Sequence, residues 1–316
     1  PLKSINLNKT SGTKYIGETE NLTVIYNPSN TTDNKNVTWT SSNNNVASIN
    51  NGVVTAKGIG NAIITAKVGS LTASYKITVI KHDNPVIVKA NTLTYNGKEQ
   101  ELITVSNIKG NICYSYNPIS SCSTNESIPK KINAGEYAVY YYVSGDNNYN
   151  SKSGSIKVNI NKKSGSISYL NKSITKIQGD QAFTNVLIKT GDGIINYSSS
   201  DNKVATIDKN GKVTILSSGN TVIKAIVIDG ENYFYNIKEA SYTLTVNKKI
   251  INIPITSISL NKTSGTKYIG ETENLVVSYN PSNTTDNKSI IWTTSNSKVA
   301  TINNGVVKAV GVGNAV

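Results

Sequence analysis

The residues best suited to covalent chemistry in this sequence are two cysteines, Cys113 and Cys122. With Asn117-Pro118 as a two-residue hairpin turn, they face each other across antiparallel strands, where Cβ atoms lie about 4.5–5.5 Å apart, close to disulfide range. We therefore favour a disulfide, which would indicate an oxidising, extracellular setting. The alternative is two unpaired thiols, because proline is unusual at the second turn position and a register shift of one residue would separate the sulfur atoms.

The sequence offers little for catalysis or metal binding. Its one histidine, His82, lies beside Asp83 in a predicted linker, where we expect an exposed side chain with no nucleophile near it. A zinc site needs three or four ligands, usually Cys and His, and two cysteines with one distant histidine do not supply them. Asp208-Lys-Asn-Gly211 and Asp146-Asn-Asn148 lack the further acidic ligands of a calcium loop and are interpreted as turns. We predict no enzyme activity, no cofactor and no metal site.

Aromatic residues are the candidates for a binding surface, because exposed tyrosines can bind a protein partner or a sugar. One group lies on and after a predicted strand, with two of its members on the face opposite Tyr137, Val139 and Tyr141. The favoured alternative is that these side chains fill a second face or a domain junction. The candidates are Tyr140, Tyr142 and Tyr149 in the first group, and Tyr233, Phe234 and Tyr235 in the second.

Short β-strands must position these residues. Apolar and polar residues alternate through 71–79, which is typical of a half-buried strand. Similar runs recur at intervals of about 8–12 residues and are separated by Gly, Asn, Asp and Pro, which indicates a sandwich or barrel. No amphipathic helix is apparent. The predicted fold class is all-β, with tandem immunoglobulin-like β-sandwich domains in an elongated, beaded arrangement.

An internal repeat organises the chain. Residues 1–63 match residues 254–316 without a gap, and 47 of the 63 positions are identical. Residues 197–225 form a diverged third copy. The last copy has no equivalents of two strands of the first, so we expect the natural chain to continue. The alternative is a strand donated by another chain. The predicted domains are 1–80, 84–162, 163–249 and the incomplete copy 254–316.

Charge and hydropathy restrict the partners. The net charge is +13, and every basic residue other than His82 is a lysine. These lysines are spread evenly along the chain, whereas nucleic-acid sites concentrate charge and base readout relies heavily on arginine. We therefore expect no nucleic acid, although anionic cell-wall polymers remain candidate partners. No stretch approaches the roughly 18 apolar residues of a membrane helix, so no membrane span is expected in this segment.

Specific motifs carry a family resemblance. The first and last domains resemble the bacterial immunoglobulin-like group 2 family, and the third resembles it more distantly, with Tyr197 in place of the tryptophan. The second domain resembles another bacterial immunoglobulin-like repeat. The motifs are Trp39-Thr-Ser-Ser-Asn43, Val46-Ala-Ser-Ile49 and Gly52-Val-Val54, with their copies from Trp292 to Val307, and in the second domain Leu93 to Gln100, Asn133 to Tyr137 and Gly145 to Asn150.

The resemblance implies a spacer or binding module without catalytic residues, of the kind found in invasin- and intimin-like adhesins. Our leading hypothesis is a non-catalytic structural stalk or fibre segment of a repetitive adhesin, extracellular on a bacterial cell surface and packed against neighbouring repeats of the same chain. One alternative is a binding module for a host protein or a glycan. Another is an accessory region of a large wall enzyme or a phage structural protein.

Overall fold

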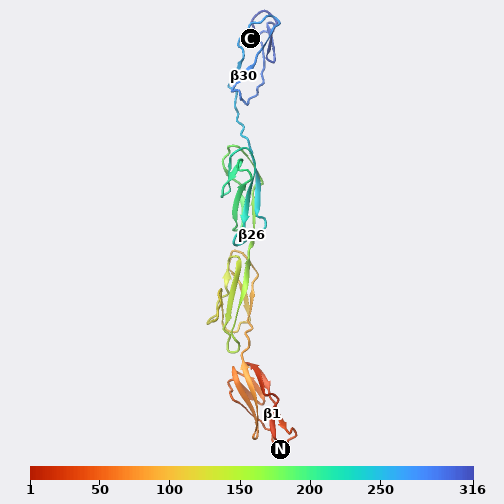
Figure 1. The fold of residues 1–316 in the computed structure, drawn as a ribbon, viewed down its shortest axis with the longest axis vertical. Helices are drawn as coiled ribbons and strands as arrows, with labels where there is room; N and C mark the ends of the chain where they lie inside the picture. Colours follow the sequence, from red (N-terminus) through yellow and green to blue (C-terminus); the bar gives the residue numbers. More distant parts are fainter. The chain divides into compact units, whose positions relative to one another are not determined.

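The computed structural model describes residues 1–316 and consists of strands, turns and loops, with no helix (Figure 1). Every sheet takes its strands from one of the four predicted domains, which we call segments one to four. The predicted all-β class with immunoglobulin-like sandwiches is confirmed. No helix of a length and apolarity that would cross a membrane is present.

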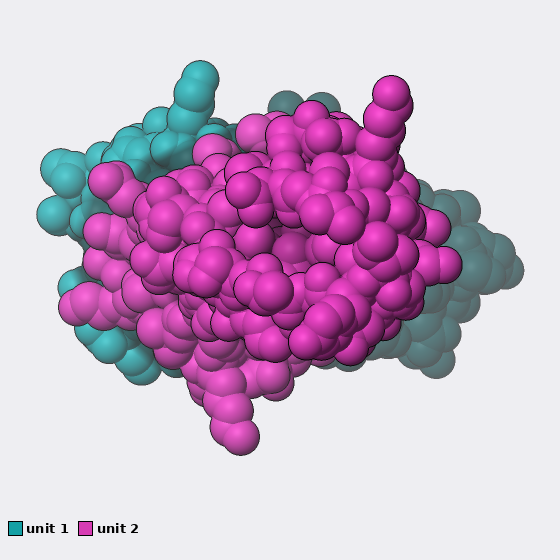
Figure 2. Space-filling model, turned by 90° about the horizontal axis from the view of Figure 1, so that it is seen from above, with its two compact units in different colours: residues 1–168, 188–195, 226–239 teal, residues 169–187, 196–225, 240–316 magenta.

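The chain forms two compact units, coloured separately in Figure 2. The first unit contains all of segments one and two, together with parts of segment three. The second unit contains the rest of segment three and all of segment four. Their residues are 1–168, 188–195 and 226–239 in the first unit, and 169–187, 196–225 and 240–316 in the second.

Segment one is built on two long neighbouring strands whose residues alternate between core and solvent. Ile64, Tyr75 and Ile77 are fully buried at its centre, as the period-two pattern predicts. The sheets are β1 (Ser4–Leu7) with β4 (Val24–Asn27); β2 (Ser11–Tyr15), β9 (Leu71–Ile80), β8 (Gly60–Val68) and β5 (Thr38–Ser41); and β3 (Thr19–Asn21), β7 (Val53–Ala56) and β6 (Ala47–Asn50).

Segment two follows the same plan, with a core around Leu102, Val139 and Ile160. Its largest sheet places β14 at one edge, which leaves one side of that strand without a ladder partner. The sheets are β10 (Ile87–Ala90) with β13 (Ile103–Ser106); β11 (Leu93–Thr94), β17 (Lys152–Asn161), β16 (Gly135–Val143) and β14 (Ile112–Ser115); and β12 (Gln100–Glu101) with β15 (Lys130–Lys131).

Segment three also contains three sheets, and each of the first two includes a parallel pair, β18 with β26 and β19 with β27. The sheets are β21 (Leu187–Thr190), β18 (Lys163–Tyr169) and β26 (Tyr233–Tyr235); β19 (Ser173–Ile177), β27 (Glu239–Asn247), β25 (Gly219–Ile228) and β22 (Ile194–Ser199); and β20 (Phe183–Thr184), β24 (Lys212–Ile215) and β23 (Ala205–Ile207).

Segment four contains two sheets. Residues 264–268 and 291–294, the copies of β2 and β5, belong to no strand. The sheets are β28 (Ser257–Leu260) with β30 (Val277–Asn280), and β29 (Thr272–Asn274), β32 (Val306–Ala309) and β31 (Ala300–Asn303).

Candidate binding surface and the disulfide loop

Cys113 and Cys122 are joined by a disulfide, with their Cα atoms 5.5 Å apart. The predicted hairpin between them is wrong. Cys113 lies in β14, which pairs with β16 and places Tyr142 opposite Cys113, whereas Cys122 lies in the loop that follows β14. Pro118 has no N–H to donate to a ladder, and the long strand β16 offers a continuous partner instead. The disulfide therefore closes a loop rather than bridging two paired strands.

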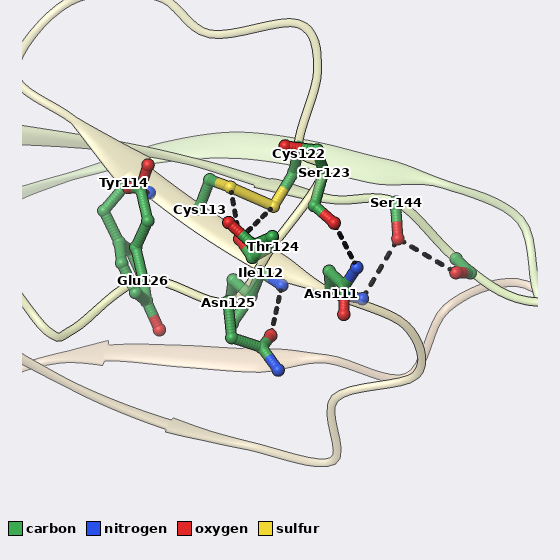
Figure 3. Close-up of a disulfide and its surroundings, with 11 residues drawn as sticks. Asn111, Ile112, Cys113, Tyr114, Cys122, Ser123, Thr124, Asn125, Glu126 and Ser144 are labelled. Carbon is green, nitrogen blue, oxygen red and sulfur yellow. Dashed lines mark hydrogen bonds between the residues drawn. A yellow bond between two sulfur atoms is a disulfide. The ribbon is translucent and has the colours of Figure 1, made fainter.

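Side chains of this loop satisfy the free edge of β14 (Figure 3). The Ile112 N–H donates to Asn125 Oδ1 at 2.9 Å, and the Tyr114 N–H donates to Glu126 Oε2 at 2.9 Å. The Glu126 N–H in turn donates to the Ile112 carbonyl at 3.0 Å. Exposed edge strands are templates for pairing with other chains. The disulfide loop thus covers this edge with side-chain hydrogen bonds instead of a further strand.

Both sulfur atoms also approach the Thr124 carbonyl oxygen, at 3.0 Å from Cys113 and 3.2 Å from Cys122. A disulfide sulfur carries no hydrogen, so these approaches are contacts and not hydrogen bonds. The loop is anchored further by Asn111, whose Nδ2 donates to the Ser123 carbonyl at 2.7 Å. Cys113 itself is buried. The loop is therefore held at several points on both sides of the disulfide.

Tyr140 and Tyr142 lie on the outer face of the largest sheet in segment two. Tyr140 is flanked by Ser115 on β14 and Ser155 on β17, and Tyr142 stands opposite Ser153. Both tyrosine rings are half-buried. On the opposite face Val139 is fully buried in the core, with Tyr137 packed beside it, as alternation predicts. The two outer rings and their serine neighbours form the candidate binding surface.

Tyr149 does not extend this surface, because it packs against a different part of the first unit. Its ring lies 5.4 Å from the His82 ring, measured between centroids, and Lys109 Nζ is 5.5 Å from the centre of its ring. His82 stacks on Tyr15 at 4.5 Å. The prediction of an exposed histidine at position 82 is therefore wrong, because aromatic rings on two sides leave it half-buried.

The second aromatic group is not a surface cluster. Tyr235 is only 2% exposed, and its hydroxyl donates to the Thr190 carbonyl at 2.8 Å and accepts from the Gly193 N–H at 3.1 Å. Its inclusion among the binding residues is wrong, since alternation in β26 turns it to the core. Tyr233 packs edge-on against Tyr95 at 5.6 Å, and Phe234 is exposed at the sheet surface.

The acidic turns behave as the sequence indicates. Asp146 Oδ1 accepts from the N–H groups of Asn148 and Tyr149, and Asp208 Oδ1 accepts from those of Asn210 and Lys212. The hydrogen bond from the Lys212 N–H is the largest cause that lowers the pKa of the Asp208 carboxyl, and the bond from the Asn210 N–H adds to it. Carboxylates that close their own turns are typical of Asx motifs. The prediction that both sequences form turns is confirmed.

The family comparisons agree with this architecture. Residues 1–79 and 254–316 match the model of the bacterial Ig-like domain, group 2. Both regions are bacterial immunoglobulin-like domains of group 2. Residues 186–228, within segment three, match the intimin immunoglobulin-like domain. Immunoglobulin-like domain families are generally non-catalytic, in keeping with the fold described above.

Two relatives are much longer than the matched regions. A protein of Clostridium acetobutylicum is 32% identical over 152 residues, which cover 46% of this chain and 15% of the relative. Intimin of Escherichia coli O157:H7 is 35% identical over 79 residues, which cover 25% of this chain and 8% of intimin. The matched regions thus span only a small part of each relative.

Solved structures of other tandem domains are similar at low identity. The titin I-band fragment I67–I69 matches with a TM-score of 0.30 and 13% identity over 79% of this chain and 100% of the fragment. Drosophila N-cadherin EC1-4 matches with a TM-score of 0.27 and 11% identity over 78% of this chain and 76% of the cadherin chain.

Proposed function

We propose that this chain is part of the structural stalk of a bacterial cell-surface adhesin. The observation that carries the proposal is the return of residues 1–63 at 254–316, after three segments that each fold around their own strands. Repetition adds length without adding a new site, and the stability of such arrays is spread over their repeats. The repeated residues 1–63 contain no cysteine and no histidine.

The family matches and the disulfide support this proposal. Group 2 domains at residues 1–79 and 254–316, with a match to the intimin immunoglobulin-like domain between them at 186–228, fit a surface adhesin. The Cys113–Cys122 disulfide fits an oxidising location outside the cell, because cytosolic proteins keep their thiols reduced. We place the protein on the bacterial surface for these two reasons. Labelling of intact cells with a membrane-impermeant amine reagent should modify its lysines.

An in-frame deletion of residues 1–253 from the natural protein tests the stalk role. Pro254 then takes the place of Pro1, its equivalent in the repeat, so the new connection joins matching positions. We expect cells to keep their ligand binding while the distance at which they capture a ligand-coated probe in force spectroscopy becomes shorter. Loss of ligand binding with unchanged surface display would contradict a stalk and assign recognition to the deleted unit.

A second candidate function is recognition of a host protein or glycan by the Tyr140–Tyr142 surface. The specific observation is a pair of half-buried rings, bordered by Ser115, Ser153 and Ser155, on the solvent face of a sheet. Tyrosine and serine together supply rigid contact area and adaptable hydrogen bonds in binding surfaces. Residues 1–253 would be tested against extracellular-matrix, immunoglobulin and glycan panels. Saturable binding that Tyr140→Ala/Tyr142→Ala weakens, and that Tyr26→Ala leaves unchanged, would support this candidate.

A further inference from the structure

Two connections between segments in the first unit are held by the same set of contacts. At each, a lysine in the connection reaches a loop of the following segment, and that loop carries an Asn-Tyr pair. The two loops are 145–150 in segment two and 229–235 in segment three. Neither contact set follows from the group 2 motifs, because both loops lie outside the regions that match that family.

The first set joins segments one and two. Lys81 Nζ donates to the Asp146 carbonyl at 2.6 Å, and the His82 N–H donates to the Asn148 carbonyl at 2.9 Å. Tyr149 then packs on His82, which in turn stacks on Tyr15 at the end of β2. The loop of segment two is therefore bound both to the connection and to the body of segment one.

The second set joins segments two and three with matching atoms. Lys162 Nζ donates to the Gly230 carbonyl at 2.6 Å, and the Lys163 N–H donates to the Asn232 carbonyl at 2.9 Å. Tyr233 packs edge-on against Tyr95, which follows β11 directly. Asn232 adds a further bond, because its Oδ1 accepts from the Ala134 N–H at 2.8 Å. Here, too, the loop contacts both the connection and the preceding segment.

The two loops are equivalent position by position. Each loop is closed by one backbone hydrogen bond to the carbonyl of its tyrosine. The Asp146 N–H donates to the Tyr149 carbonyl at 3.1 Å, and the Gly230 N–H donates to the Tyr233 carbonyl at 3.0 Å. The carbonyl of the same donor residue, Asp146 or Gly230, accepts the hydrogen bond from the lysine of the connection. In both loops, the carbonyl of the first residue, the carbonyl of the asparagine and the ring of the tyrosine therefore contact the connection or the preceding segment in the same order along the chain.

The connection between segments three and four is exposed. Lys248 and Lys249 are exposed and belong to no strand, and Ile250 beyond them is 89% exposed. Asn252 and Ile253 bond to Thr285 of segment four. In segment one, the closest sequence match to segment four, β8 and β9 are joined by Gly69 and Ser70 alone. A two-residue turn is too short to carry an Asn-Tyr loop.

We propose that the two Asn-Tyr loops are clasps that hold each pair of adjoining segments in one orientation, whereas residues 248–251 are a hinge. A 253-residue repeat would then alternate three clasped sandwiches with one flexible point. Tyrosine rings suit this role because they bury a large area at low cost in side-chain entropy. The inference concerns the joints alone and holds whether or not the protein is a stalk.

Brief trypsin digestion of the natural protein tests the proposal, because trypsin cleaves after lysine and needs a locally free backbone. Mass spectrometry of the new ends gives the rate at each connection. We expect cleavage after Lys248 or Lys249 to be at least about 10-fold faster than after Lys81 or Lys162. The clasped connections must first open locally, and the free energy of this opening lowers the population that trypsin can cleave. Similar rates at all three connections would overturn the proposal.

Two single variants separate a clasp from general instability. Tyr149→Ala should speed cleavage after Lys81 by about 10-fold and leave Lys162 unchanged, and Tyr233→Ala should do the reverse. Tyr149→Phe and Tyr233→Phe keep the ring and should behave as the wild type. If an alanine variant accelerated both sites, or neither, the assignment of that tyrosine to its own joint would be wrong.

Distance measurements test the orientation itself. Spin labels on non-natural amino acids at exposed positions leave the disulfide intact. Pairs across each clasp should give narrow distance distributions, and the pair across the hinge a broad one. Equal widths at all three would refute the clasps. Suitable positions are Lys67 with Lys98, Lys98 with Asn236, and Lys209 with Lys298, which are all exposed.

Discussion

Segments one and four are nearly the same sequence in two different structural settings. Ser11 to Tyr15 form strand β2 in segment one, but the identical residues from Ser264 to Tyr268 belong to no strand. In segment one β2 runs parallel to β9, and β5 pairs with β8. In segment four the described residues end at Val316, the copy of Ile63 in β8, so they include only the first residues of the β8 counterpart and none of the β9 counterpart. A strand sequence therefore becomes a strand here only where its long-range partner is present, because β-propensity depends strongly on context.

Burial differs between the two segments in the same way. Leu7 is 7% exposed and its copy Leu260 is 39% exposed, while Ile5 is 4% exposed and Ile258 is 64% exposed. Both copies still form their strands, since β1 pairs with β4 and β28 pairs with β30 in the same register. Local pairing thus survives without the long strands, whereas the closed core requires them.

The largest expected effect comes from breaking the strand that closes segment one. Ile64 in β8 is fully buried, and Ile64→Ala should lower the free energy of unfolding of this segment by about 2–5 kcal/mol, because it removes buried methyl groups and leaves a cavity. Hydrogen exchange of residues 11–15 should then approach that of 264–268. Ile63→Ala is the matched control, since Ile63 is 50% exposed and its loss should change stability by less than about 0.5 kcal/mol. Equal effects of the two variants would contradict this account of the core.

The disulfide loop offers a second way to expose an edge. It covers β14 without a neighbouring strand, so Cys113→Ser/Cys122→Ser should leave that edge as open as the edges in segment four. Releasing a loop of this size should destabilise segment two by about 2–3 kcal/mol. Chemical denaturation would measure the loss of stability. Hydrogen exchange of the folded variant should be faster at the Ile112 and Tyr114 N–H groups, with segment one unchanged as an internal control. Unaltered exchange at both residues would mean that Asn125 and Glu126 hold the edge alone.

A pair of equivalent glycines sharpens the comparison further. A Cβ added at Gly12 would overlap the Tyr75 hydroxyl, which is buried without a hydrogen-bond partner, whereas a Cβ at Gly265 meets nothing within 4 Å. Gly12→Ala should therefore cost about 1–3 kcal/mol through overpacking. Gly265→Ala should be neutral to within about 0.5 kcal/mol. Thermal unfolding of the two variants would distinguish the sites, and a neutral Gly12→Ala would show that Tyr75 can move aside.

The smallest expected effect lies in a feature that both segments share. Glu20 pairs with Lys9 at 2.6 Å and Lys14 at 3.0 Å, and Glu273 pairs with Lys262 at 2.5 Å and Lys267 at 2.9 Å. The bond from Lys9 is the main cause that lowers the pKa of Glu20, and Lys262 with Lys267 lowers the pKa of Glu273 to about 2. Both carboxylates should therefore titrate below an ordinary glutamate by NMR.

Stability should follow these pKa values in a defined direction. A folded-state pKa below the unfolded value contributes stability above the unfolded pKa and loses it as the pH falls through the folded pKa. For Glu20 the loss begins near its ordinary value of 4.5 and proceeds to more acidic pH. Glu20→Gln should reduce this pH dependence and lower the neutral-pH stability of segment one by no more than about 1 kcal/mol. An unchanged acid transition would show that other carboxylates govern it.

The sequence by itself determined the features that depend on local pattern. The alternation through 71–79 predicts which side chains of β9 enter the core, and Tyr75, Ile77 and Val79 are indeed buried. The repeat and its Trp and Gly motifs predict the immunoglobulin-like class and the family, which the family matches confirm. These predictions succeed because strand periodicity and turn chemistry are encoded within a few neighbouring residues.

Only the tertiary structure decided which distant residues meet. It placed Cys122 in a loop instead of a paired strand, turned Tyr235 into the core, and brought Tyr15, His82 and Tyr149 together at one joint. It also made one copy of Ser-Gly-Thr-Lys-Tyr a strand and left the other unpaired. The physical reason is that ladders, stacked rings and closed cores join residues far apart in the chain, so no local pattern specifies them.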